Sequence, residues 1–378
     1  MERRQRSRST ERRTVKRQRG SSSASDSSPS RKNYFKVQSW MNKSTSQNSG
    51  TFSLWKGLDF TRLGINYDTK NLSLEELFSL VENRCNDKIK DMPEVTQLLI
   101  RLTKDYFKLS FKNIGIFEAN NRTEEDIKLV EDSNCQLNLD INEEIKKLSE
   151  LIIDRPDNTG TFYKWFLNLK RFHSRDLKRF LYTLCHNYEV KERDYQLLFM
   201  KFSEIFLMEP IPGDCCENST EINGEMFVYG ADIKYERPQS MKSFLNVYVN
   251  GINKHNEKLY ENIDAGKESR VIDSLSEDLL DKVAKELLLD RRNSCFCPGV
   301  IGILCCGTKI IFLYCEVTPN HYKAAMEKSE DLGDWYHSII HFTKAYDYMS
   351  AEDRNEIIPY LFWLGYVQSS KYKIFDIS

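Results

Sequence analysis

A strongly basic segment opens the chain, and it limits which part of the sequence can form a compact fold. Residues 1–32 contain eleven Arg and Lys residues and three acids, a formal charge of +8, with almost no apolar residues. The whole chain carries −1, so residues 33–378 carry −9. Such a segment cannot bury enough apolar surface to offset its ordering entropy. We therefore expect residues 1–50 to form a disordered basic tail rich in Ser and Arg.

The tail contains a dense basic cluster that is typical of a nuclear import signal. Its members are Arg12, Arg13, Lys16, Arg17 and Arg19. These cations predict a nuclear location, a nuclear import receptor as a partner, and added nonspecific contact with nucleic acid. A solubilising leader with no receptor is the alternative. Arg-Ser dipeptides and the Ser28-Pro29 step predict phosphorylation, which would reduce the positive charge.

Composition indicates that the rest of the chain is globular. Apolar residues make up 40% of the sequence and aromatic residues 12%, which is enough for a sizeable core. The sequence has no apolar run long enough to cross a membrane and no apolar stretch of a signal peptide, so no membrane partner is expected. The ten cysteines show no C-x-x-C spacing, which predicts reduced and mostly buried thiols.

Residues 51–190 have the periodicity of helices and are expected to form a helical region. Ser73 and Glu76 have the spacing of a capping box, after which apolar residues recur at helical steps. A second helix is expected over residues 94–109, and one or two more over 123–153.

An aromatic stripe with interleaved cations occupies residues 161–193. The stripe consists of Phe162, Trp165, Phe166, Leu169 and Phe172. The cations between and after these residues are Lys164, Lys170, Arg171, Arg175, Lys178 and Arg179. Because bases stack on rings and cations neutralise phosphates, one interpretation is a nucleic-acid-binding surface. The other is an amphipathic core helix with a solvated charged face, which the helical spacing of the rings favours. Both hold if the rings are buried and the cations face outward.

Residues 191–378 combine strand and helix patterns, which predicts an α/β region with a mixed sheet flanked by helices. The expected elements are helices over 192–208, 274–290, 331–348 and 351–364, strands over 225–235, 243–249 and 371–377, and a hairpin of strands over 300–305 and 309–317. The predicted fold class of the whole chain is therefore α+β.

The order of elements in part of this region resembles the restriction-endonuclease-like, or PD-(D/E)xK, core. If Gly230 divides the first strand pattern, residues 192–317 read as helix, three strands, helix and two strands. The segment that begins at Gly299 is similar to the one after the core helix in fungal and oomycete relatives. In that family, acids from a helix and a strand hold a divalent cation that activates water, and an acid-x-Lys on the next strand completes the site.

The resemblance implies a role for two acids. Glu204 would be the helix acid and Asp232, which follows an apolar stretch, would be the strand acid, with Mg²⁺ as the cofactor. The next strand reads Asn246-Val-Tyr-Val-Asn250 and has no acid-x-Lys, so a lysine such as Lys234 or Lys242 would have to come from elsewhere. The missing second acid reduces the charge available to hold Mg²⁺ and weakens the prediction of cleavage.

Two histidines provide the other candidate chemistry. His337 and His341 are four residues apart in an expected helix, with Asp334 one turn earlier, and this spacing can ligate zinc together with Cys295 and Cys297. Ordinary histidines on an aromatic-rich helix are the favoured alternative, and no metal site is expected.

The sequence thus predicts three functions, in this order. The first is a nuclear, non-catalytic protein that binds nucleic acid or a chromatin-associated partner through its basic tail and cationic helical face. The second is a divalent-metal-dependent nuclease built on Glu204 and Asp232. The third is a protein-interaction scaffold whose tail serves nuclear import.

Overall fold

The computed structural model of the chain places its described residues in one compact unit, Thr51–Ser378. The described ranges are 60–84, 92–111, 128, 156–185, 190–213, 218–222, 225–229, 231–236, 243–250, 270–296, 298–327, 332 and 335–368. The expected disordered tail, nearly all of the helices expected over 123–153 and the strand expected over 371–377 lie outside these ranges.

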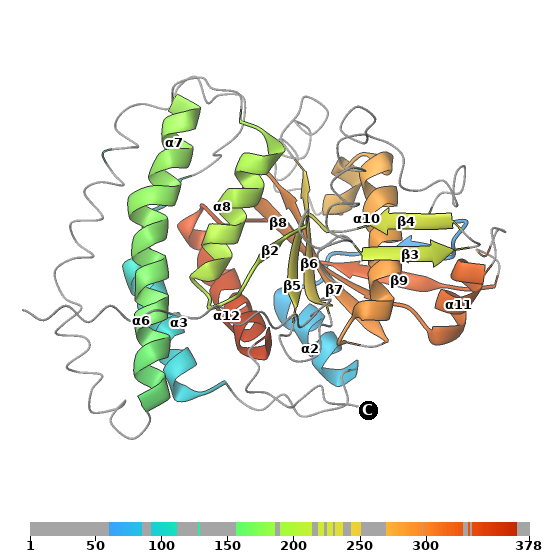
Figure 1. Cartoon of the computed structure of the whole chain (residues 1–378), viewed down its shortest axis with the longest axis horizontal. Coiled ribbons are helices and arrows are strands. Elements are labelled where there is room, and N and C mark those ends of the chain that lie inside the picture. The colour runs from blue at the N-terminus through green and yellow to red at the C-terminus, as the bar shows by residue number, and fades with distance from the viewer. Residues whose placement is uncertain are drawn as a thin grey trace, which may run out of the picture. The chain divides into compact units, whose positions relative to one another are not determined.

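A mixed sheet forms the centre of this unit (Figure 1). Its strands are β1 (Ile65–Tyr67), β2 (Ile211–Pro212), β5 (Ile233–Glu236), β6 (Ser243–Asn250), β7 (Gly299–Cys306), β8 (Lys309–Glu316), β9 (Ser338–Phe342) and β10 (Tyr346–Asp347). Seven of them follow the order β1-β9-β8-β7-β6-β5-β2, and β10 pairs with β8. A separate two-stranded ladder joins β3 (Asn218–Ile222) to β4 (Glu225–Tyr229).

The sheet combines hairpins with two parallel pairs. β7 and β8 form an antiparallel hairpin whose short turn contains Gly307 at a φ of 60°, a conformation that glycine adopts without strain. β6 runs parallel to β7, and α10 (Glu277–Asp290) lies between them in the sequence, as a parallel connection requires. β1 runs parallel to β9, which joins the start of the described chain to its last third.

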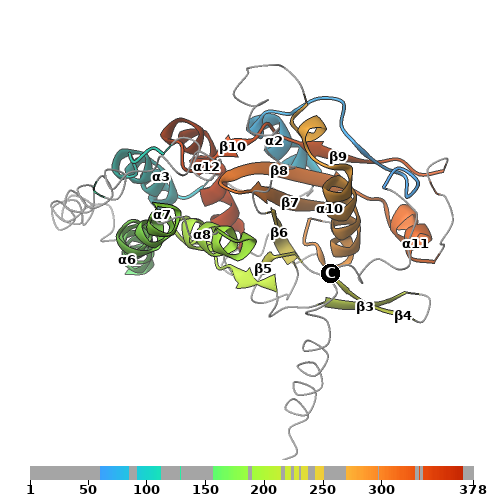
Figure 2. The ribbon, with the colours of Figure 1, turned by 90° about the horizontal axis from the view of Figure 1, so that it is seen from above.

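Helices cover both faces of the sheet (Figure 2). One face packs against α10 and α11 (Pro319–Glu327). The other packs against a larger group: α2 (Leu74–Arg84), α3 (Glu94–Tyr106), α6 (Pro156–Arg171), α7 (Lys178–Cys185), α8 (Glu192–Glu204) and α12 (Ala351–Gln368). Because both faces are covered, every residue of β7 is buried.

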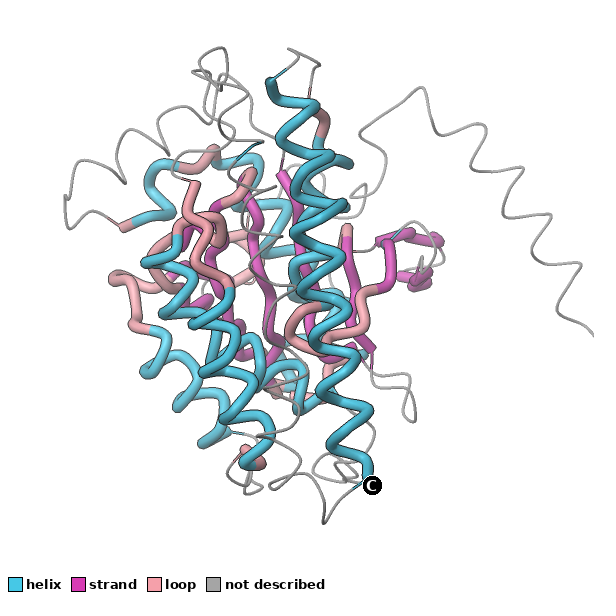
Figure 3. The backbone as a smooth tube through the Cα atoms, turned by 90° about the vertical axis from the view of Figure 1, so that its left-hand side faces the viewer, coloured by secondary structure: helices cyan, strands magenta, loops and turns pink. Residues whose placement is uncertain are grey.

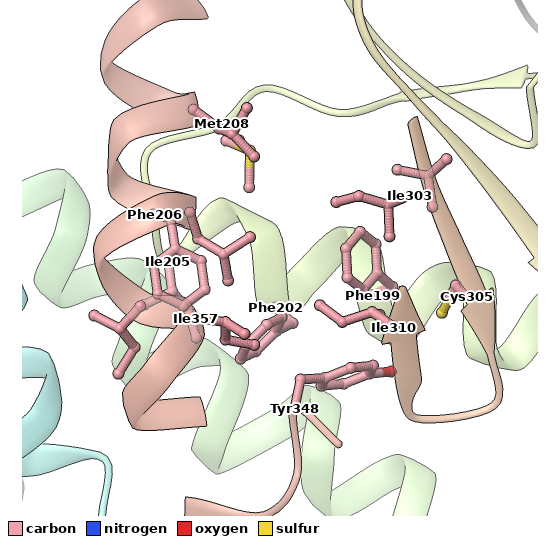
Figure 4. Close-up of a cluster of buried hydrophobic side chains, with 14 of the residues drawn as sticks. Phe199, Phe202, Ile205, Phe206, Met208, Ile303, Cys305, Ile310, Tyr348 and Ile357 are labelled. Atoms are coloured by element: carbon pink, nitrogen blue, oxygen red, sulfur yellow. The ribbon is translucent and has the colours of Figure 1, made fainter. Parts of the chain in front are cut away.

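The larger core forms where α8 meets the hairpin and α12 (Figure 4). Phe199 and Phe202 of α8 point toward Ile303 of β7 and Ile310 of β8. The ring of Phe202 stacks on Tyr348 with centroids 4.7 Å apart. This contact fixes α8 against the sheet, and α8 in turn supports the helices outside it.

The predicted α+β class, with a C-terminal mixed sheet flanked by helices, is confirmed. The expected helix over 331–348 is wrong, because this segment contains β9 and β10. Ile340 and Phe342 are buried whereas Ile339 is 43% exposed, which is the alternation of a strand. The first half of the strand expected over 225–235 is β4, which pairs with β3, so the strand beside β5 in the main sheet is β2.

Candidate nucleic-acid interface

A long helical rod carries the cations that the sequence singled out. It consists of α6, a π-helical turn over Phe172–Leu177 and α7. The backbone at both junctions, Arg171 and Lys178, is right-handed helical, so the three parts form one continuous rod. At 1.5 Å per residue its length is about 45 Å. Figure 3 shows the rod running along the side of the molecule.

The aromatic stripe of the rod faces the core. Phe162, Trp165 and Phe172 are at most 1% exposed. The indole N–H of Trp165 donates a hydrogen bond to Thr103 Oγ1 of α3 at 2.9 Å, which satisfies the only polar atom of this buried ring. The rings therefore hold the rod in place and are not available to stack on bases.

The cations of the rod face outward. We define the cationic face as Lys164, Lys170, Arg171, Arg175, Lys178 and Arg179. Lys178 is half-buried and the other five are exposed. Between residues 160 and 185 the rod contains one acid, Asp176. The sequence interpretation that combined buried rings with an outward basic face matches these positions.

Two cations of this face have carboxylate partners. Lys164 Nζ lies 2.6 Å from Glu209, and Arg175 Nε lies 2.8 Å from Asp176. Exposed pairs of this kind contribute little to stability and are easily exchanged for another anion. Within the described ranges, the guanidinium groups of Arg171 and Arg179 have no carboxylate at ion-pair distance. The face therefore keeps a net positive charge.

The structure places the two acids of the nuclease prediction at different positions along α8. Glu204 contacts Lys201, and its backbone carbonyl accepts a hydrogen bond from Asn168 at 2.6 Å. Asp232 lies beside Gln196, whose side chain donates to the Asp232 carbonyl. Gln196 and Glu204 are eight residues apart, which is about 12 Å along a helix. Glu204 and Asp232 are thus not brought to one site.

Asp232 instead belongs to a charged cluster between β5 and α10, which the sequence analysis missed. Lys234 and Asp290 are completely buried, and Glu286 is 5% exposed. Burial raises the pKa of Glu286 well above its usual value; nearby Lys282 opposes this, and Asp232 adds to it. Burial also raises the pKa of Asp290 to about 6, against the opposing effect of Lys234. The i, i+4 spacing of Glu286 and Asp290 on α10 was the available signal.

This cluster does not fit Mg²⁺. The cation requires ionised oxygen ligands, and burial holds Glu286 toward its protonated form. Asp232 Oδ2 already accepts a hydrogen bond from the Val249 N–H at 2.6 Å. In the part of the chain that is described, no three His, Cys, Asp or Glu side chains gather closely enough to hold a metal ion.

The remaining sequence candidates are placed as follows. The tail cations Arg12, Arg13, Lys16, Arg17 and Arg19 lie outside the described residues. His341 is on β9, where its Nδ1 lies 2.6 Å from Asp68 Oδ2. Asp334 and Cys297, which the zinc interpretation needed, are also outside the described residues.

No described helix combines the length and the apolar character that crossing a membrane requires. Comparisons of the chain with protein-family models, with curated proteins and with solved structures found no match.

Proposed function

We propose that the protein is a nuclear, non-catalytic protein that binds nucleic acid through the cationic face. The observation that carries this proposal is the composition of the outward side of the rod, six cations against one acid. The rod is anchored by its buried rings, so its cations are held on a rigid element. A phosphate backbone gains from such a surface because each neutralised phosphate releases a condensed counterion.

The nuclear location rests on the sequence of the tail. Its basic cluster is the type of signal that an import receptor binds, and its charge would add contacts to nucleic acid once the protein is in the nucleus. A tagged full-length chain should enter the nucleus, whereas a variant that lacks residues 1–32 should remain outside.

The binding test compares two variants of equal charge. The first replaces four residues of the cationic face with Gln: Lys170, Arg171, Arg175 and Arg179. The matched control replaces four exposed cations elsewhere with Gln: Lys70, Lys108, Arg292 and Lys323. The affinity of the wild-type chain for a labelled oligonucleotide is measured by fluorescence anisotropy over a range of salt concentrations.

Binding should weaken steeply as salt increases, and the first variant should flatten this dependence by about 3 to 4 phosphate contacts, while the control retains it. Equal losses in both variants would show that net charge alone governs binding. No salt-dependent binding by the wild-type chain would contradict the proposal and leave the interaction scaffold.

The metal-dependent nuclease stays a second prediction. The parallel β6–α10–β7 connection and the position of Asp232 before β5 agree with the element order that suggested it. The donor set around Asp232 counts against it, as described above. Cleavage of a labelled oligonucleotide in Mg²⁺ or Mn²⁺ that disappears in Asp232→Ala would support a nuclease, and inertness in both metals would exclude it under those conditions.

A further inference from the structure

A groove separates α7 and the π-helical turn from α8, and its volume is about 340 Å³. Its lining combines charged and apolar side chains. The charged groups that face an incoming anion are Arg175 and Arg179 from the rod and Lys201 from α8. The apolar groups are Phe180, Leu197 and Leu198. The groove is continuous with the cationic face, because Arg175 and Arg179 belong to both.

Partners already occupy most of the charges in the groove. The two acids that line it are Asp176, which pairs with Arg175, and Asp194, which accepts a hydrogen bond from the Lys191 N–H at 2.9 Å. Lys201 contacts Glu204, which does not line the groove. Arg179 is exposed, and among the described residues no carboxylate lies within ion-pair distance of it. An anion that enters the groove therefore meets one uncompensated guanidinium.

Apolar surface lies directly beside this charge. Leu197 is 43% exposed, although the neighbouring Phe180 and Leu198 are at most 5% exposed. Phe180 is fixed by an edge-to-face contact with Tyr195, with ring centroids 5.4 Å apart. A ligand that fits this lining has a flat apolar part and an anionic part close together, which is the chemistry of a nucleotide.

We propose that this groove seats one unpaired nucleotide, so that the ligand of the cationic face is a single-stranded nucleic acid. The base lies against Leu197 above Phe180, and its phosphate is bound by Arg179 and Lys201. The inference rests on the proposed function and narrows it. A duplex can satisfy the cationic face, but its paired and stacked bases cannot enter the groove, so the groove favours single strands.

Two substitutions in the groove, each with a matched control on the same rod, test this. Arg179→Ala is compared with Arg171→Ala, which removes another exposed and unpaired arginine outside the groove. Leu197→Ala is compared with Leu167→Ala, which removes an apolar side chain that is 58% exposed on α6. Each full-length variant is titrated with labelled oligothymidylate and with a duplex of equal length, and its thermal unfolding midpoint verifies that it is folded.

Arg179→Ala should reduce affinity for the single strand about 10-fold and Arg171→Ala only about 2- to 3-fold, the loss of one ordinary phosphate contact. Leu197→Ala should reduce single-strand affinity about 3- to 5-fold and leave duplex affinity unchanged, and Leu167→Ala should change neither.

Equal losses for the two arginine variants, or equal wild-type affinity for single strand and duplex, would overturn the groove and leave the cationic face intact. A wild-type chain that binds neither oligonucleotide would instead overturn the proposed function itself. Binding of an acidic or phosphorylated peptide that depends on Arg179, without binding of oligothymidylate, would assign the groove to a protein partner and contradict the inference.

Discussion

The guanidinium of Arg354 lies flat against the ring of Phe107, with its central carbon 3.7 Å from the ring centroid. Arg354 is completely buried, and its nitrogens donate hydrogen bonds to backbone carbonyls on two sides. Nη1 reaches Tyr348 and Met349, and Nη2 reaches Phe107 and Leu109. This single side chain therefore joins the end of α3 to the start of α12, and it lies behind the rod that carries the cationic face.

Substitution of Arg354 should be strongly destabilising. In Arg354→Lys the ammonium cannot reach both pairs of carbonyls and loses the flat contact with Phe107, so we expect the free energy of unfolding to fall by about 2 to 4 kcal/mol. Arg171→Lys, at an exposed position of the rod, should change it by less than about 0.5 kcal/mol. Equilibrium unfolding in urea measures both, and equal values would show that the backbone contacts of Arg354 contribute nothing.

His173 should make the protein sensitive to acid. Both ring nitrogens are buried without a hydrogen-bond partner among the described residues. Burial, with the adjacent Arg354 charge, lowers the pKa of His173 to about 3. The unfolded chain takes up this proton near pH 6.5, whereas the folded chain does not, so stability present above pH 6.5 is lost as the pH falls toward 3. The loss amounts to at most about 5 kcal/mol.

The variant His173→Phe retains an aromatic ring between Phe107 and Phe172 and removes the two nitrogens. Its free energy of unfolding should depend less on pH between 6.5 and 3 than that of the wild-type chain. Parallel pH profiles for the two proteins would contradict the assigned role of His173.

Asp290 should have the opposite pH dependence. Burial raises its pKa to about 6, although Lys234 and a hydrogen bond from Tyr248 oppose the shift. The folded chain retains this proton between pH 3.8 and 6 and the unfolded chain does not, so its contribution is present below pH 3.8 and is lost as the pH rises through 6. Asp290→Asn retains an acceptor for Tyr248 and should raise stability at pH 7 by up to about 3 kcal/mol. Thermal melts at pH 5 and pH 7 measure the difference, and a variant less stable at both would contradict it.

Two glycines in helices should respond to alanine in opposite directions. A Cβ on Gly365 of α12 would lie 2.0 Å from the Phe206 carbonyl oxygen, so Gly365→Ala forces α12 away from the end of α8. We expect a loss of more than about 2 kcal/mol. A Cβ on Gly160 of α6 would meet nothing within 4 Å, and Gly160→Ala should stabilise the chain by up to about 1 kcal/mol. Unfolding midpoints of the two variants distinguish these signs.

Local signals in the sequence predicted the elements that depend on local chemistry. The capping box at Ser73 and Glu76 is formed, with the Ser73 N–H 2.7 Å from Glu76 Oε2 and the Glu76 N–H 3.1 Å from Ser73 Oγ. The hairpin around Gly307 was readable for the same reason, since a short turn between two apolar runs has few alternatives. The aromatic stripe likewise identified the buried side of the rod.

Features that depend on tertiary packing were not readable. β9 is a five-residue strand among aromatic residues, and only its pairing with β8 and β1 separates it from a helix. Glu286 and Asp290 read as a solvated side of α10, because no local pattern shows that β5 covers them. The groove depends on how α8 lies against the rod, and therefore on which residues Arg179 and Leu197 face.

The pairing of β1 with β9 has a consequence for the birth of the protein on the ribosome. Asp68, just after β1, meets His341 of β9 across 273 residues of sequence. At ordinary rates of translation, roughly 15 to 55 s separate the emergence of the two partners. During that interval the first strand has no sheet to join, and the central strands have no completed edge. Nascent chains should therefore depend on chaperones that shield apolar segments until most of the polypeptide has been made.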